Sequence, residues 1–192
     1  SHQLLSATAP PCAAPIGQLA GHRCPAPGCP GAGHLRLSHL GVVSALVDAL
    51  PASADEKKKV IACIGEKNAH GIQALCEACG AEASLAEKLI TLTYAYGKPS
   101  EVYQTLRALS LGEDAEKALS ELETITDTLR SIGFGDRVNI EFSVVNDMNY
   151  YNGIVFRGFV NGIPTGILSG GQYDKLMAKM GRKSGAIGFA VY

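Results

Sequence analysis

The segment Asn146–Phe189 decides the fold, and it reads NDMNYYNGIVFRGFVNGIPTGILSGGQYDKLMAKMGRKSGAIGF. The run Ile154-Val155-Phe156 alternates into Gly158-Phe159-Val160, and Asn161-Gly162 follows, the pair most typical of a tight hairpin turn. We therefore expect a return strand over 163–168. The pattern as a whole predicts a strand, a turn, a strand, a glycine pair, a short helix and a final strand.

Two tyrosines and two glycines in this segment indicate a binding site. Tyr150 and Tyr151 precede the first strand, and Gly170 and Gly171 follow the second. Another molecule can approach the backbone closely where side chains are missing. Aromatic hydroxyls beside such backbone suit a pocket for a small polar metabolite. Tyr150 alternates to the other side of the chain from Tyr151, so we interpret it as structural.

The region before this segment predicts helices between two strands. His34–Leu37 is a candidate strand, and Ser38 is predicted to cap a helix that begins at His39. We interpret His39 as a cap or core residue and not as a catalyst. Apolar residues at helical spacing predict further helices over 55–65, 69–79, 85–96, 100–109 and 114–132. These helices form a predicted insertion over about 51–132.

The period changes after the last of these helices. Val138, Ile140, Phe142 and Val144 alternate with other residues, which predicts a strand with these four side chains on one face. This strand would deliver the tyrosines to the end of a sheet. The predicted fold class is α+β, with an antiparallel sheet flanked by helices.

Length and composition place the chain among single-domain globular proteins. It has 192 residues, of which 46% are hydrophobic and 18% charged. Its net charge of −1 gives no basic field, so tRNA is not an expected partner. Apolar runs are too short to span a membrane, and prolines interrupt the apolar residues over 4–20, so we expect a cytoplasmic protein. We expect residues 1–32 to be an irregular Pro/Gly-rich segment, or several separate pieces of chain. Residues 33–192 are expected to form the folded domain.

The six cysteines allow a disulfide, a zinc site or ordinary thiols, and a lysine run allows two interpretations. The cysteine pairs Cys24/Cys29 and Cys76/Cys79 could hold zinc, but the second pair lies in a predicted helix end and not in a knuckle. We predict ordinary thiols, no metal and no other cofactor. The run Lys57-Lys58-Lys59 could contact phosphate, but a solvated helix face explains it more simply.

Two blocks of the opening segment resemble a known family. NDMNYYNGIVF and SGGQYDKLM are similar to the two histidine-recognition blocks of the histidyl-tRNA synthetase catalytic core. The run SGAIGFA resembles the strand that leads into the third class II signature. The resemblance covers about 33–192 and implies part of a class II aminoacyl-tRNA synthetase-like core with a helical insertion. It also implies that Tyr151 and Tyr173 contact histidine and that Gly170 and Gly171 line the ligand.

Departures from this family pattern concern its charged residues. Asn146 and Gln172 stand where the family has arginines, and neither carries the charge that stabilises a developing phosphate. The ATP-binding motifs would precede Leu35 and are not found. Asp174 suits the first turn of the short helix, which we interpret as capping. The free amides of that helix could receive a carboxylate.

The combined pattern resembles the synthetase-like regulatory subunits of ATP phosphoribosyltransferase, which support the first step of histidine biosynthesis. This resemblance implies no catalytic residue in this chain and a short-form catalytic subunit as partner in a homo- or hetero-oligomer. The candidate ligand is histidine, contacted by Tyr151, Tyr173, Gly170, Gly171, Asn146 and Gln172. Two alternatives remain: a fragment of a histidyl-tRNA synthetase, which charges tRNA with histidine, and a synthetase-like sensor domain.

Overall fold

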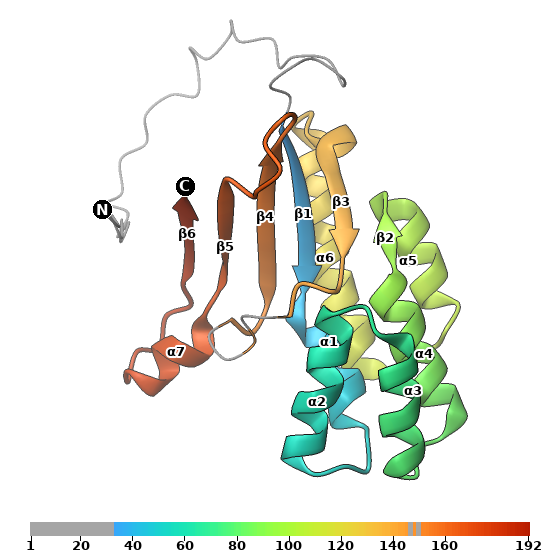
Figure 1. The fold of residues 1–192 in the computed structure, drawn as a ribbon. Coiled ribbons are helices and arrows are strands. Elements are labelled where there is room, and N and C mark those ends of the chain that lie inside the picture. Colours follow the sequence, from blue (N-terminus) through green and yellow to red (C-terminus); the bar gives the residue numbers. More distant parts are fainter. Residues whose placement is uncertain (1–32, 146–147, 149–150) are drawn as a thin grey trace, which may run out of the picture.

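The computed structural model describes residues 33–145, 148 and 151–192. Among these residues, six strands form one sheet in the order β2-β3-β1-β4-β5-β6 (Figure 1). The strands are β1 (Gly33–His39), β2 (Tyr96–Gly97), β3 (Val138–Glu141), β4 (Ile154–Val160), β5 (Leu168–Gln172) and β6 (Ile187–Val191). Within the described part of the chain, β1 and β3 are the one parallel pair, so the prediction of a mainly antiparallel sheet is confirmed.

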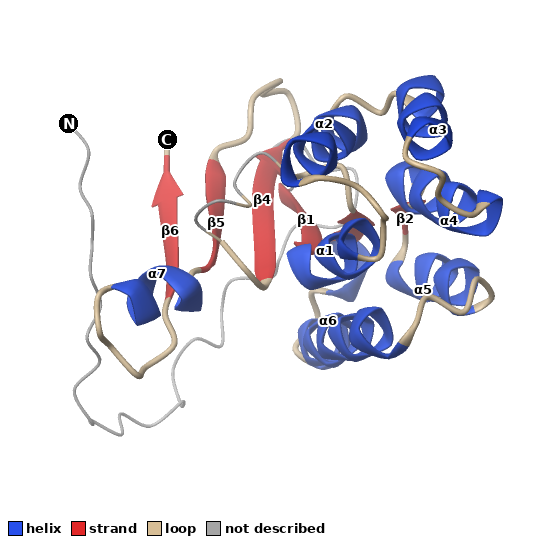
Figure 2. Ribbon diagram, turned by 90° about the horizontal axis from the view of Figure 1, so that it is seen from below, coloured by secondary structure: helices blue, strands red, loops and turns tan. Residues whose placement is uncertain are grey.

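The predicted helices are present, most with bounds within two residues of those expected. They are α1 (Leu40–Asp48), α2 (Ala54–Gly65), α3 (Ala69–Ala78), α4 (Ala83–Tyr94), α5 (Pro99–Arg107), α6 (Glu113–Ser131) and α7 (Asp174–Lys179), with a 3-10 turn at Gly135–Arg137. Seen from below, α1 to α6 gather at the β2–β4 side of the sheet, whereas only α7 lies beside β5 and β6 (Figure 2). Local signals explain the helix starts: Ser53 and Glu56 form a capping box at α2, and Pro99 occupies the first turn of α5.

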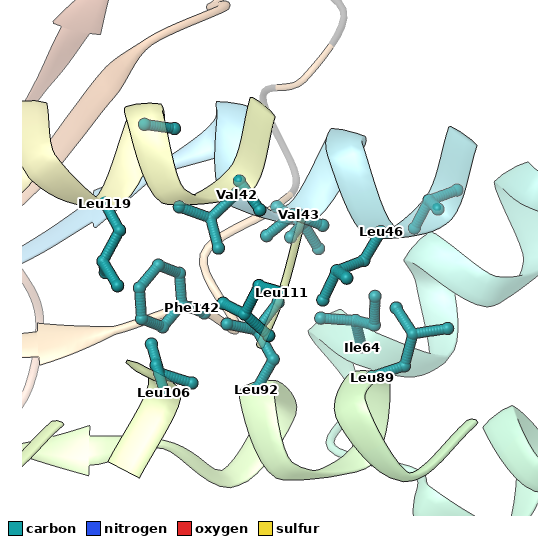
Figure 3. Packing of buried hydrophobic residues seen from close by; sticks show 14 of the residues in the cluster. Val42, Val43, Leu46, Ile64, Leu89, Leu92, Leu106, Leu111, Leu119 and Phe142 are labelled. Atoms are coloured by element: carbon teal, nitrogen blue, oxygen red, sulfur yellow. The ribbon is translucent and has the colours of Figure 1, made fainter. Parts of the chain in front are cut away.

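One face of the sheet is buried under helices α1 and α6. Leu37 of β1 and Ile140 of β3 are directly opposite each other, and both belong to the apolar core. Phe142 follows β3 and is fully buried between Leu106 and Leu119, below Val42 (Figure 3). Because side chains alternate along a strand, the intervening residues lie on the other face, which these helices leave open.

Two details of the strand predictions are wrong. The loop after β4 spans 161–167, and the return strand begins at Leu168 and not directly after Gly162. Gly162 does have the positive φ expected of a turn, 89°. Strand β3 ends at Glu141, and the turn that follows places Val145 in the core, while Val144 is only half-buried. The alternation therefore holds through Phe142 and then shifts by one residue.

The start of α1 also differs from the prediction, because His39 and not Ser38 is the cap. The Nδ1 atom of His39 accepts a hydrogen bond from the Gly41 amide at 3.0 Å, which requires the proton to be on Nε2. That Nε2 lies 3.1 Å from a Glu121 carboxylate oxygen on α6. The cap or core interpretation of His39 is thus confirmed. Ser38 is instead the last buried residue on the open face of β1.

We expect Phe142→Ala to lower the free energy of unfolding by about 3–5 kcal/mol, because the site is enclosed by several elements and cannot collapse. Urea denaturation of the purified protein measures the change. Phe134→Ala is the control, since this side chain is 42% exposed and should cost clearly less. Equal losses in the two variants would contradict the packing described here.

The His39 cap predicts a pH dependence of stability. Burial lowers the pKa of His39 below 6.5, although the hydrogen bond and charge of Glu121 act in the opposite direction. The unfolded chain then binds more protons than the folded one, so this stabilisation is complete above 6.5 and is lost as the pH falls through the folded pKa. Urea denaturation at about pH 7.5 and about pH 5.5 should show this loss as a smaller free energy of unfolding at the lower pH.

The matched variants for that measurement are His39→Asn and His70→Asn. Asparagine can still cap a helix but does not titrate, so His39→Asn should reduce the pH dependence. His70 is exposed on α3, and its substitution should leave the pH dependence unchanged. A reduction of the same size in both variants would show that His39 is not responsible.

Candidate functional site

Two predicted tyrosines meet at one end of the open face. Tyr151 precedes β4, and Tyr173 is the residue before α7. Their ring centroids are 6.5 Å apart, with planes inclined by 58°. Both side chains are half-buried, so they lie at the protein surface and not in the core. The pair can therefore contact a small molecule on this face.

Glycines form the floor beneath the two rings. Val155 of β4, Gly171 of β5 and Gly188 of β6 lie directly opposite one another across the sheet. A Cβ at Gly171 would lie 2.8 Å from Cδ1 of Tyr151, and a Cβ at Gly188 would lie 2.8 Å from Cε1 of Tyr173. Real Cβ atoms do not approach other atoms so closely. The rings can occupy these places only because both positions are glycine.

The two predicted glycines have different roles. Gly171 lies on the open face below Tyr151, as a site residue should. Gly170 is its neighbour in β5 and so faces the opposite side, where an added Cβ would collide with the Phe156 ring and the Gly188 carbonyl oxygen. Neither glycine forms a bulge before the helix, because both are regular residues of β5 paired to two neighbouring strands.

Gln172 lies beside the tyrosines and is engaged locally. Its Nε2 donates to the Asp174 carboxylate at 2.5 Å, and its side chain occupies the space next to Gly153 that a Cβ there would need. Position 172, where the resembling family has an arginine, therefore contributes a neutral amide bonded within the protein. Asn146 and Tyr150 lie outside the described residues.

The prediction that Asp174 caps α7 is wrong. The N-cap residue Tyr173 forms no side-chain cap bond, and the second Asp174 oxygen accepts from the Ala186 amide at 2.8 Å. Asp174 thus connects α7 to the chain just before β6. The Lys175 amide in the first turn of α7 is also engaged, since it donates to Oδ1 of Asn152 at 3.2 Å. These bonds fix the loops that carry Tyr151 and Tyr173.

Sequence reasoning missed two residues of this floor. Gly188 was present in the quoted block, but only the pairing of β6 with β5 places it under Tyr173. Ser38 lies opposite Val155 in the same row, and it is 1% exposed. Its hydroxyl has no hydrogen-bond partner among the described residues. A buried hydroxyl usually has a partner, so its position at the edge of this floor is unusual.

The other predicted features lie away from the site. Cys76 is buried in α3, and Cys79 is the cap at its end, followed by Gly80 with a φ of 72°. These two and Cys63 are free thiols, and burial raises the pKa of Cys76. Cys24 and Cys29 lie outside the described residues. Within the described ranges, no helix is long and apolar enough to cross a membrane.

Comparison with known proteins places this chain in a family context. A model of the histidyl-tRNA synthetase family matches residues 28–192. An ATP phosphoribosyltransferase regulatory subunit from Alkaliphilus metalliredigens is 27% identical, over 82% of this chain and 40% of its own length. A protein of the same name from Acetivibrio thermocellus is 32% identical, over 76% of this chain and 35% of its own length. The chain thus spans well under half of these curated relatives.

Solved structures give the same fold. A Bacillus halodurans protein described as an ATP phosphoribosyltransferase regulatory subunit/histidyl-tRNA synthetase matches with a TM-score of 0.73 and 27% identity, over 83% of this chain and 42% of its own. A histidyl-tRNA synthetase from Nostoc matches with a TM-score of 0.69 and 26% identity, over 84% and 40%. The prediction of an α+β class II synthetase-like core is confirmed.

The glycine floor predicts a coupling between Gly171 and Tyr151. Gly171→Ala and Gly170→Ala should each lower the free energy of unfolding by about 1–3 kcal/mol through overpacking. In a Tyr151→Ala background, Gly171→Ala should cost less, because the ring that its Cβ would meet is gone. Gly170→Ala lies on the other face and should cost the same in both backgrounds.

A double-mutant cycle by urea denaturation measures this coupling. Additive effects for both glycines would show that the Tyr151 ring does not rest on Gly171. If Tyr151 were coupled to Gly170 and not to Gly171, Gly170 would face the tyrosine and Gly171 would face the other side of the sheet.

Proposed function

This chain belongs to the histidyl-tRNA synthetase family, and from that premise we propose that it is part of a non-catalytic regulatory subunit of ATP phosphoribosyltransferase. In this role it supports the first step of histidine biosynthesis by binding the catalytic subunit, and it holds histidine on the open face. The chain spans 40% or less of the curated relatives named above, so the proposal concerns the whole protein to which it belongs.

The observation that carries the proposal is the environment of Gln172. Amino-acid activation by ATP develops negative charge on phosphate, and an arginine fork is suited to stabilise it. Gln172 is neutral, and its amide already bonds Asp174 beside the tyrosines. Asn146, in the other arginine position, is neutral as well. A site with neutral side chains at both positions favours binding over adenylate chemistry.

Histidine as the ligand is supported by the tyrosine pair and its floor. Tyr151 and Tyr173 bring two aromatic hydroxyl groups to one point of the surface, and Gly171 and Gly188 let the two rings lie close to the sheet. A ligand can regulate a partner only if it binds one state of the complex more tightly than another. Histidine held here would therefore act by changing the stability of the assembled complex.

A second function, histidyl-tRNA ligation, is favoured by one observation. The solved histidyl-tRNA synthetase from Nostoc is nearly as similar to this chain as the Bacillus halodurans protein is. The two functions differ in one reaction, because only a synthetase exchanges pyrophosphate into ATP in the presence of histidine. That exchange assay separates them directly.

The full-length protein should raise the activity of a short-form ATP phosphoribosyltransferase catalytic subunit and should show no histidine-dependent ATP–pyrophosphate exchange. Mixing the purified proteins and measuring phosphoribosyl transfer tests the first expectation. Calorimetric titration with histidine tests ligand binding separately. Measurable exchange would identify a synthetase, and no gain in transfer on mixing would reject the regulatory role.

Tyrosine-to-phenylalanine variants test the site without disturbing its packing. Tyr151→Phe and Tyr173→Phe keep the rings on their glycines and remove one hydroxyl each, so each should weaken histidine binding by about tenfold. Tyr94→Phe is the matched control, because Tyr94 lies on α4 and bonds the Lys67 carbonyl oxygen. Equal histidine affinity in the wild type and the three variants would show that histidine binds elsewhere. The regulatory role would still be tested by mixing the protein with the catalytic subunit.

A further inference from the structure

The open face carries a second row of residues, most of them polar, next to the glycine floor. Arg36 of β1, Arg157 of β4, Ser169 of β5 and Ala190 of β6 lie directly opposite one another across the sheet. Opposite residues of antiparallel strands share a face. The row is two residues along each strand from the floor of Val155, Gly171 and Gly188, which is a distance of roughly 7 Å.

Arg36 is neutralised and held in place. Its Nη1 lies 2.8 Å from a Glu141 carboxylate oxygen, and its guanidinium is 4.5 Å from the Phe159 ring centroid. Glu141 also pairs with Lys67 Nζ at 2.9 Å. Burial acts to raise the pKa of Glu141, but the hydrogen bonds from Lys67 and Ser143 and the nearby charges lower it, so the carboxylate is ionised. Its charge is shared between two cations.

Arg157 lies opposite Arg36 without such compensation. It is half-buried and forms no ion pair with any residue that the structure describes. Like charges directly opposite each other in a sheet are destabilising. Among the described residues, the local group therefore contains the cations Arg36, Lys67 and Arg157 but only Glu141 as an acid. An anion at Arg157 would balance the excess.

Hydroxyl groups lie on the side of Arg157 that is away from Arg36. Ser169 is its direct partner in β5, and the Ser169 hydroxyl lies 3.1 Å from the Tyr192 hydroxyl. An arginine fork with two hydroxyls provides several donors for one group of oxygens. We propose that Arg157, Ser169 and Tyr192 bind an oxyanion, the phosphate or carboxylate group of a small molecule, beside the tyrosine pair. This proposal requires neither histidine binding nor a partner subunit.

Calorimetric titration of the full-length protein with inorganic phosphate and with acetate, at constant ionic strength set by chloride, tests the site. We expect saturable binding of at least one of the two, and the difference between them tells whether the site takes phosphate or carboxylate. Arg157→Gln should weaken the binding by about tenfold, and Tyr192→Phe by about threefold. Arg130→Gln is the matched control, because Arg130 is exposed on α6 and pairs with Asp127.

A second measurement separates binding from folding. Without added anion, Arg157→Gln should melt at the same temperature as the wild type or higher, because it removes the repulsion with Arg36. Binding of neither anion, or equal affinity in wild type and Arg157→Gln, would overturn the proposal. A lower melting temperature for Arg157→Gln would also overturn it, because Arg157 would then hold the fold.

Discussion

The burial of one sheet face against α1 and α6 is the constraint on which the rest of the structure depends. Leu37, Ile140 and Phe142 enter the core from β1, β3 and the turn after β3. Alternation along the strands then determines the other face, because each apolar residue turned inward turns its neighbours outward. Arg36, Arg157 and Gly171 lie on the open face for this reason, so the core selects the surface on which the two tyrosines and their glycine floor are found.

On that open face, small residues determine where aromatic rings can lie. Gly171 and Gly188 are neighbours across two strands, and each supports one tyrosine ring. The loops that carry these rings are fixed by short polar contacts, in which Asp174 bonds Gln172 and Ala186 and Asn152 bonds Lys175. The same contacts make Gln172 part of the scaffold, which explains how a neutral residue is accommodated at a position where the family has a cation.

Charge on the open face is distributed differently from what the family blocks imply. The two block positions are neutral, whereas Arg36, Lys67 and Arg157 bring positive charge to the adjacent part of the sheet. Glu141 is the buried carboxylate around which two of these cations gather. A surface with aromatic hydroxyls at one point, and beside it an arginine with no ion pair among the described residues, suits small ligands that carry both a polar and an anionic group.

Local sequence patterns predicted the helices, a strand that begins at 138, the strand over 154–160, and the two blocks that bring Tyr151, Tyr173 and Gly171 together. Helical and strand periods are local, so a single segment reveals them. The tertiary structure alone decided that Gly170 faces away from the site, that Gly188 lies under Tyr173, and that His39 and not Ser38 caps α1. It also decided that Arg157 faces Arg36. Each of these facts depends on the pairing of strands distant in sequence or on a contact with a distant helix, and a local pattern carries no information about cross-strand register.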